Sequence, residues 1–226
     1  MDITPPLDGD AVLWSEGDRT GRPLLVLLHG YGSHEGDLFS LVPYLPDAFA
    51  IAAVRAPLTP PWPSPGHSWY PIEGLNGRDG QRVTDAATRL TEWIDEVSDA
   101  TTVGLLGFSQ GGAVALQALR LHPDRFVFAV ALSGYAAPDA LPGDDAVKER
   151  RPPVFWGRGS ADEVIPEPLI AHTVQWLPEH TDLTGRVYPG LGHSVSEQEL
   201  SDVRTFLDRR LDALTAPADA PAPDAS

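Results

Sequence analysis

The chain has 226 residues, of which 42% are hydrophobic and 21% charged, a composition typical of a soluble globular domain rather than a disordered or fibrous chain. Its 32 acidic residues against 16 basic ones give a formal charge of −16, which disfavours binding to nucleic acid or anionic lipid. The absence of cysteine excludes disulfides, cysteine nucleophiles and thiolate metal sites, so any nucleophile must be oxygen or nitrogen.

The sequence gives no sign of export or of membrane insertion. The first six residues carry an acid and two prolines where a secretory signal needs basic residues and an apolar run. No window supplies the roughly 18 consecutive apolar residues of a membrane span. We therefore expect a cytoplasmic, soluble protein without stable membrane association.

Short, continuous apolar runs predict strands that are buried on both faces of a parallel sheet. The clearest of these runs are Pro23–Leu28, Ala48–Val54, Thr102–Leu106 and Phe126–Leu132, with weaker candidates at Val154–Trp156 and Arg186–Tyr188. Between and after them, apolar residues at helical spacing predict helices over Gln81–Val97, Ala113–Leu121, Pro168–Leu177 and Ser196–Leu214. Alternating strands and helices predict an α/β fold with a mostly parallel sheet in a single domain, residues 1–214.

Two segments fit no regular element. Residues 215–226 are rich in Pro, Ala and Asp and lack large apolar side chains, so we expect a disordered tail. The stretch Pro57–Pro71 combines six prolines with three aromatic residues, too apolar for a free loop, and we expect it to pack over another part of the protein.

The sharpest chemical signal is Gly107-Phe108-Ser109-Gln110-Gly111, which lies directly between a predicted strand and a predicted helix. A serine in such a turn is held in strained backbone angles, and glycines two residues to either side let strand and helix approach closely. The alternative is a glycine-rich structural or phosphate-binding turn, but neither phosphate-loop pattern is present. We therefore predict Ser109 as a nucleophile.

A serine hydroxyl needs an imidazole as its base and a carboxylate to orient that imidazole, in the chain order Ser, acid, His for this kind of turn. His193 lies in a glycine loop after a predicted strand and is the preferred base, whereas His122 suits a helix end and His172 and His180 suit solvated positions. No metal or cofactor is implied.

The acid should also follow a strand. Asp162 lies in the turn after the strand candidate at 154–156 and is preferred, with the adjacent Glu163 as its rival. Weaker alternatives lie in the acidic loop Ala137–Asp145, namely Asp139, Asp144 and Asp145.

The oxyanion of an acyl-transfer reaction needs two backbone N–H donors. We expect them at Gln110, after the nucleophile, and at Tyr31, in the His29-Gly30-Tyr31-Gly32 loop that follows the first central strand. His29 itself is interpreted as a structural loop histidine.

These motifs, with Ser68-Trp69-Tyr70, Gly159-Ser160-Ala161-Asp162 and Gly192-His193 in this order, resemble the carboxylesterase and acyl-protein thioesterase (phospholipase/carboxylesterase) family of α/β hydrolases over roughly residues 24–207. The resemblance implies a Ser109–Asp162–His193 triad and oxyanion donors at Tyr31 and Gln110. The chain departs from the family pattern at Arg158, where histidine is frequent, and at Pro71, where aspartate is. Both departures put substrate preference in doubt more than reaction type.

By the same resemblance, the proline-rich loop covers the site and forms an apolar pocket with Trp62, Trp69 and Tyr70, although core packing is the alternative for these rings. Val164, Ile165 and Val195 flank the triad and are candidates for the same pocket. Either the proline-rich loop or the acidic loop of residues 137–145 is a candidate lid.

The sequence as a whole predicts a serine hydrolase that cleaves carboxylic esters of small to medium apolar acyl groups through an acyl-enzyme. A thioesterase or a lysophospholipase is the nearest alternative, and a non-catalytic ligand-binding protein is the alternative of another class. The expected partner is a small ester or thioester, and a homodimer is compatible with the resemblance.

Overall fold

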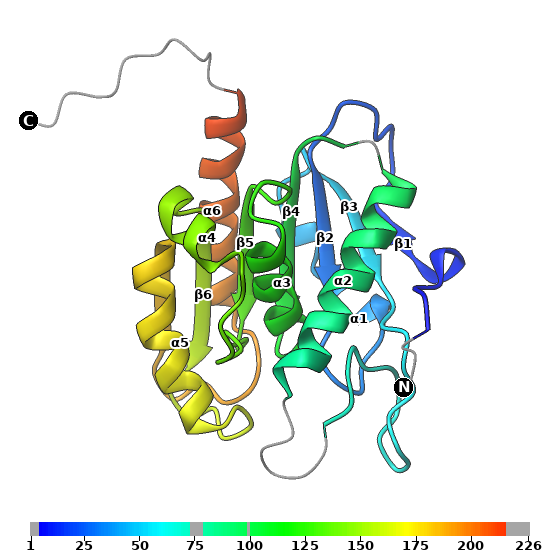
Figure 1. The fold of residues 1–226 in the computed structure, drawn as a ribbon. Coiled ribbons are helices and arrows are strands. Elements are labelled where there is room, and N and C mark those ends of the chain that lie inside the picture. Colours follow the sequence, from blue (N-terminus) through cyan, green and yellow to red (C-terminus); the bar gives the residue numbers. More distant parts are fainter. Residues whose placement is uncertain (1–4, 73–78, 99, 216–226) are drawn as a thin grey trace, which may run out of the picture.

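The computed structural model describes residues 5–72, 79–98 and 100–215, which form one central sheet with helices on both faces (Figure 1). The sheet contains seven strands in the order β1-β3-β2-β4-β5-β6-β7, all parallel except β1, which pairs antiparallel with β3. The strands are β1 (Leu13–Trp14), β2 (Leu24–Leu28), β3 (Ala50–Val54), β4 (Val103–Phe108), β5 (Phe128–Leu132), β6 (Pro153–Gly159) and β7 (Asp182–Tyr188). The predicted α/β fold with a mostly parallel sheet is therefore confirmed.

The helices divide between the two faces of the sheet, as Figure 1 shows. They are α1 (Glu35–Phe39), α2 (Gly80–Val97), α3 (Gln110–Leu121), α4 (Asp144–Arg150), α5 (Glu167–His180) and α6 (Glu197–Thr215), with short 3-10 turns at Gly9–Ala11 and Val42–Tyr44. One apolar cluster joins the sheet to α2, α3 and α5, and a second cluster on the opposite face joins it to α1 and α6.

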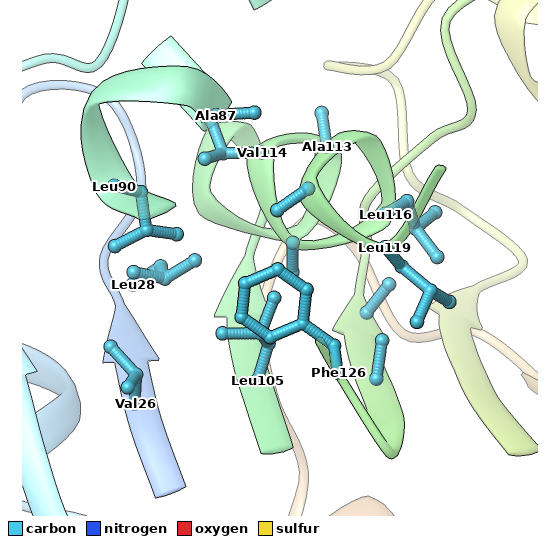
Figure 2. Packing of buried hydrophobic residues seen from close by; sticks show 14 of the residues in the cluster. Val26, Leu28, Ala87, Leu90, Leu105, Ala113, Val114, Leu116, Leu119 and Phe126 are labelled. Carbon is cyan, nitrogen blue, oxygen red and sulfur yellow. The ribbon is translucent and has the colours of Figure 1, made fainter. Parts of the chain in front are cut away.

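The central strands were predictable because every residue of β2, β3 and β5 is buried. On one face of the sheet, Leu28 and Leu105 pack beneath α2 and α3, in the same buried cluster as Leu90 and Val114 (Figure 2). Apolar burial of this extent is the main stabilising contribution to such a fold. It fixes the carboxyl ends of β2 and β4 side by side.

Several boundaries differ from the sequence prediction. β3 begins at Ala50 instead of Ala48, and β6 and β7 extend beyond the three residues predicted for each. The predicted acidic loop of residues 137–145 gives way to α4 at Asp144. The predicted tail lies outside the described residues, apart from Thr215, which is the last residue of α6.

The proline-rich loop packs against the segment after β2, as the sequence predicts. The N–H of His67 donates to the carbonyl of Ser33 at 2.7 Å, and the N–H of Gly32 donates to the carbonyl of His67 at 2.8 Å. A Cβ at Gly66 would lie 2.4 Å from the carbonyl oxygens of Gly32 and Ser33, so only glycine permits this contact. The loop is thereby fixed next to the carboxyl end of β2.

Candidate active site

Ser109 lies in a sharp turn between β4 and α3. Its backbone angles, φ 53° and ψ −114°, lie in a region that non-glycine residues rarely adopt and that is strained. The turn is close-packed: a Cβ at Gly107 would lie 2.2 Å from the backbone of Gly111, and a Cβ at Gly111 would lie 2.0 Å from the carbonyl oxygen of Leu28. The two glycines therefore permit the strained turn that presents the Ser109 side chain, as the sequence predicts.

Three side chains from three different loops meet at this turn. The hydroxyl of Ser109 lies 2.8 Å from Nε2 of His193, and Nδ1 of His193 lies 2.8 Å from Oδ2 of Asp162. Asp162 follows β6, and His193 follows β7, so the carboxyl ends of parallel strands bring them together. The structure thus brings together the three residues that the sequence selected.

The environment of Asp162 keeps it ionised. Its side chain is 1% exposed, and burial by itself would raise the pKa of its carboxyl. The hydrogen bond from His193 and those from the backbone N–H groups of Val164 and Ile165 outweigh burial and hold the pKa of Asp162 below its usual range. An ionised Asp162 fixes the proton of His193 on Nδ1, which leaves Nε2 free to accept the proton of Ser109.

The rival acids do not reach His193 in this arrangement. Glu163 is exposed. Both carboxyl oxygens of Asp144 accept hydrogen bonds from Arg120, at 2.8 and 2.9 Å. Arg120 is buried, and it also donates to the carbonyls of Ala137 and Asp139. The acidic loop is therefore held to α3, and the ion pair with Arg120 gives Asp144 a structural role.

The two predicted oxyanion donors come from segments in contact. A Cβ at Gly30 would lie 3.5 Å from Cβ of Ser109, which shows how closely the segment before Tyr31 approaches the nucleophile. Gln110 opens α3 directly after Ser109. Within the described residues, neither the backbone N–H of Tyr31 nor that of Gln110 donates to another backbone group.

His29 has a structural role within this framework. Its Nε2 accepts the N–H of Ala56 at 3.1 Å, so its proton lies on Nδ1 and is donated to the carbonyl of Gly30 at 2.7 Å. Burial lowers the pKa of His29 to about 4, although the Gly30 carbonyl opposes this shift. A neutral His29 thus links the segment after β3 to the loop that carries Tyr31.

A network that the sequence analysis did not identify holds the aromatic segment over the turn. The side chain of Gln110 accepts the N–H of Trp69 at 2.8 Å and donates to the carbonyl of Tyr70 at 2.6 Å. The indole N–H of Trp69 donates to the carbonyl of His29 at 2.9 Å, and the hydroxyl of Tyr70 lies 2.6 Å from that of Tyr135. The sequence analysis assigned Gln110 only its backbone N–H, and no local pattern links its side chain to Trp69 and Tyr70.

The residues predicted for the apolar pocket differ in burial. Trp69, Tyr70 and Ile165 are buried in the main apolar cluster, so core packing explains them. Trp62 is 92% exposed, and Val164 is half exposed. Trp69 and Tyr70 thus match the core-packing alternative, and Trp62 lies apart from them.

The remaining predicted candidates have structural positions. Val195 packs against the cluster beneath α6. His122 caps the end of α3, as predicted. The other two histidines, predicted to be solvated, are only partly exposed: His180 stacks on Trp176 with ring centres 4.1 Å apart, and Nε2 of His172 is shielded from solvent.

Two further features bear on ligands. A cavity of about 600 Å³ lies at the amino ends of the strands, lined by residues that include Trp14, Arg19 and Leu24, at the opposite end of the sheet from Ser109, so it is not the pocket of this site. In the part of the chain that the structure describes, no group of three or more His, Asp or Glu side chains is arranged to hold a metal ion. No helix among the described residues is long and apolar enough to span a membrane.

Comparison with known proteins gives one family and relatives that are named as carboxylesterases or acyl-protein thioesterases. The family model described as phospholipase/carboxylesterase matches residues 11–211. A probable carboxylesterase of Oryza sativa subsp. japonica is 30% identical over 65% of this chain and 59% of its own length, so the chain spans about three fifths of that relative. The acyl-protein thioesterase 1 of Debaryomyces hansenii is 26% identical over 84% of this chain and 92% of its own length.

Solved structures share the fold. The carboxylesterase of Bacillus cereus superposes with a TM-score of 0.74 at 19% identity, covering 88% of this chain and 93% of that one. The acyl-protein thioesterase 2 of Zea mays also gives a TM-score of 0.74, at 21% identity over 88% of this chain and 98% of that one.

Proposed function

This chain belongs to the phospholipase/carboxylesterase family of α/β hydrolases and is a hydrolase of ester substrates; from that premise we propose that Ser109, His193 and Asp162 are its catalytic triad. The observation that supports this proposal is the continuous chain of hydrogen bonds from Ser109 through His193 to Asp162, each 2.8 Å long. The hydrolase domain on this proposal spans residues 1–214, as expected from the sequence.

In the proposed reaction, Oγ of Ser109 attacks the carbonyl carbon of the ester while its proton passes to Nε2 of His193. The backbone N–H groups of Tyr31 and Gln110 stabilise the oxyanion that develops. His193 then returns the proton to the departing alcohol, which leaves an acyl group on Ser109. Water, deprotonated by the same imidazole, releases the acid.

We propose carboxylic esters of small to medium apolar acyl groups as the substrates. The acyl pocket is proposed to lie next to Ser109, with the half-exposed Val164 at its rim. Thioesters are the second candidate, because the match to a yeast acyl-protein thioesterase covers 92% of that protein. The catalytic groups address the carbonyl carbon and not the leaving atom, so both substrate classes use the same steps.

The test is hydrolysis of p-nitrophenyl esters from acetate to palmitate, beside acyl thioesters and a lysophospholipid. Wild type is compared with Ser109→Ala and His193→Ala, and an exposed serine variant, Ser194→Ala, serves as the control. We expect turnover of short and medium esters, retained by Ser194→Ala and abolished by Ser109→Ala. Activity that survives Ser109→Ala would rule out the proposed nucleophile, and the ratio of ester to thioester rates decides between the two substrate classes.

A further inference from the structure

The first turn of α6 carries a buried carboxyl group that the proposed reaction does not use. Glu199 is 1% exposed, and neither of its carboxyl oxygens has a hydrogen-bond partner among the described residues. No ion pair within that part of the chain includes it. A charged carboxylate is strongly disfavoured in such surroundings, whereas the neutral acid is tolerated more easily.

This carboxyl group lies against the sheet at a position where β6 has no side chain. A Cβ at Gly157 would lie 2.1 Å from Oε1 of Glu199, so the glutamate occupies the space that a side chain there would fill. Gly157 pairs with Leu132 of β5, and Leu132 pairs with Phe108 of β4. The ring of Phe108 lies 4.9 Å from that of His193. Glu199 therefore lies against Gly157, which is paired through Leu132 to Phe108, the residue whose ring contacts His193.

A short covalent link joins Glu199 to His193. The hydroxyl of Ser196 accepts the N–H of Glu199 at 3.1 Å and so caps α6. Only two residues separate Ser196 from His193, and one of them, Val195, packs against the cluster beneath α6. The position of the first turn of α6 therefore sets the position of the imidazole.

An ionised Glu199 has an alternative side-chain position at the amino end of α6. In a capping box, the glutamate three residues after the capping serine accepts the N–H of that serine, at the helix end where the dipole favours negative charge. Ser196 and Glu199 have the required spacing, yet Glu199 lies against Gly157 instead. The buried and capping arrangements are thus two alternatives for one side chain.

The charged groups around Glu199 favour its neutral form. Asp202 lies one turn further along α6 and accepts the hydroxyl proton of Tyr188, and the Nε of Arg186 lies 3.9 Å from the same carboxylate. The β6 residue against Glu199 is Gly157, which has no side chain and so no charge. In the loop between β7 and α6, the titratable group is His193. Burial, and then the charge of Asp202, raises the pKa of Glu199 to about 7, although its hydrogen bond at Ser196 opposes the shift.

We propose that Glu199 is a positioning residue for His193, and that its uncharged carboxyl holds the first turn of α6 against Gly157. Ionisation favours the capping arrangement, and the loop that carries His193 moves with it. The inference rests on the proposed function only in taking His193 as the base of Ser109.

The test follows two readouts from pH 6 to pH 9: kcat and KM on the best ester, and the rate at which a fluorophosphonate labels Ser109. Wild type is compared with Glu199→Gln, which is permanently neutral, and with Glu197→Gln, an exposed glutamate in the same turn. We expect kcat and the labelling rate of wild type to fall roughly three- to tenfold between pH 7 and pH 9, with KM unchanged. Glu199→Gln keeps its pH 7 rates to pH 9, and Glu197→Gln follows wild type.

Each outcome decides the proposal. A fall that is equal in Glu199→Gln and wild type, or its absence in wild type, overturns it. If wild type is labelled but hydrolyses no ester, the proposed function fails, while the labelling rates still test Glu199. A protein that is neither labelled nor active contradicts both.

A second variant covers the case in which Glu199→Gln folds poorly. Gly157→Ala places a methyl group where the carboxyl lies and displaces that flexible side chain. We expect its kcat at pH 7 to be lower roughly three- to tenfold and to change little with pH. A kcat at pH 7 equal to that of wild type would contradict the proposal.

Discussion

The side-chain oxygen of Gln110 accepts the backbone N–H of Trp69 at 2.8 Å, and its amide nitrogen donates to the next carbonyl, that of Tyr70, at 2.6 Å. These atoms are buried, so the peptide groups they satisfy have no access to water. Gln110 therefore ties the aromatic segment to the turn that carries Ser109. The residue next to the nucleophile has a structural function in addition to its proposed oxyanion N–H.

Gln110→Ala should lower the free energy of unfolding by about 2–4 kcal/mol, because it removes the side chain that hydrogen-bonds two buried peptide groups. Gln110→Glu keeps an acceptor for Trp69 but points a second acceptor at the Tyr70 carbonyl, so we expect it to be destabilised as well. Urea denaturation measures both effects. Gln81→Ala, an exposed change on α2, is the control. A Gln110→Ala protein as stable as this control would refute the stabilising role of the Gln110 side chain.

Asp162→Asn should reduce kcat about 10³- to 10⁴-fold, because an amide at this position no longer fixes the proton of His193 on Nδ1. Glu163→Gln, at the adjacent and exposed position, should change kcat less than about twofold. Steady-state kinetics on one ester distinguishes the two. A large loss in Glu163→Gln with a small one in Asp162→Asn would reverse the assignment of the acid.

Gly107→Ala should prevent folding or cost more than about 3 kcal/mol, because its Cβ would lie 2.2 Å from the backbone of Gly111, which cannot move independently. Gly185→Ala is the matched control on another strand, where the nearest atom to the added Cβ, in Leu183, is 3.7 Å away. Thermal unfolding of the two variants should differ widely. Equal melting temperatures would show that the close approach of β4 and α3 is not required.

The ion pair between Glu35 and Arg55 should make stability depend on acid pH. The hydrogen bond from Arg55 lowers the pKa of Glu35 to about 2, from 4.5 in the unfolded chain. For a lowered carboxyl pKa, the stabilisation is present above the unfolded value and is lost as the pH falls through the folded one. We expect about 1–2 kcal/mol, since Arg55 is partly solvated.

Urea denaturation of wild type and Glu35→Gln between pH 6 and pH 2 measures this contribution. The two proteins should differ in stability at pH 6, with wild type the more stable, and should converge near pH 2. Glu16→Gln, an exposed control, should parallel wild type throughout. A difference that persists unchanged to pH 2 would indicate packing rather than charge at Glu35.

The parts of the fold that follow local patterns were predictable. The central strands are fully buried and therefore apolar throughout, as in Leu24–Leu28. β7 is an edge strand, and most of its residues are partly or fully exposed, so its polar half, beginning at Asp182, gave no apolar signal. The two-residue β1 and the five-residue α1 are too short for periodicity to identify.

The candidate site divides in the same way. Ser109, Asp162 and His193 each lie in a turn with its own sequence signature at a strand end, so each was selected locally. The contact of Gln110 with Trp69 joins residues 41 positions apart, and no local pattern reports it. The exposure of Trp62 depends likewise on where the loop folds, which composition does not determine.

The strand order has a further consequence for the proposed chemistry. β5 separates the strands that precede Ser109 and Asp162, so their backbones stand two interstrand spacings apart, about 9–10 Å. Neither side chain spans that distance. The imidazole of His193, which comes from the loop after β7, hydrogen-bonds to both side chains and connects them. The width of β5 therefore sets the separation between the backbones of Ser109 and Asp162. A shift in the pairing of β5 with its neighbours would misalign these two residues even if both loops kept their conformation.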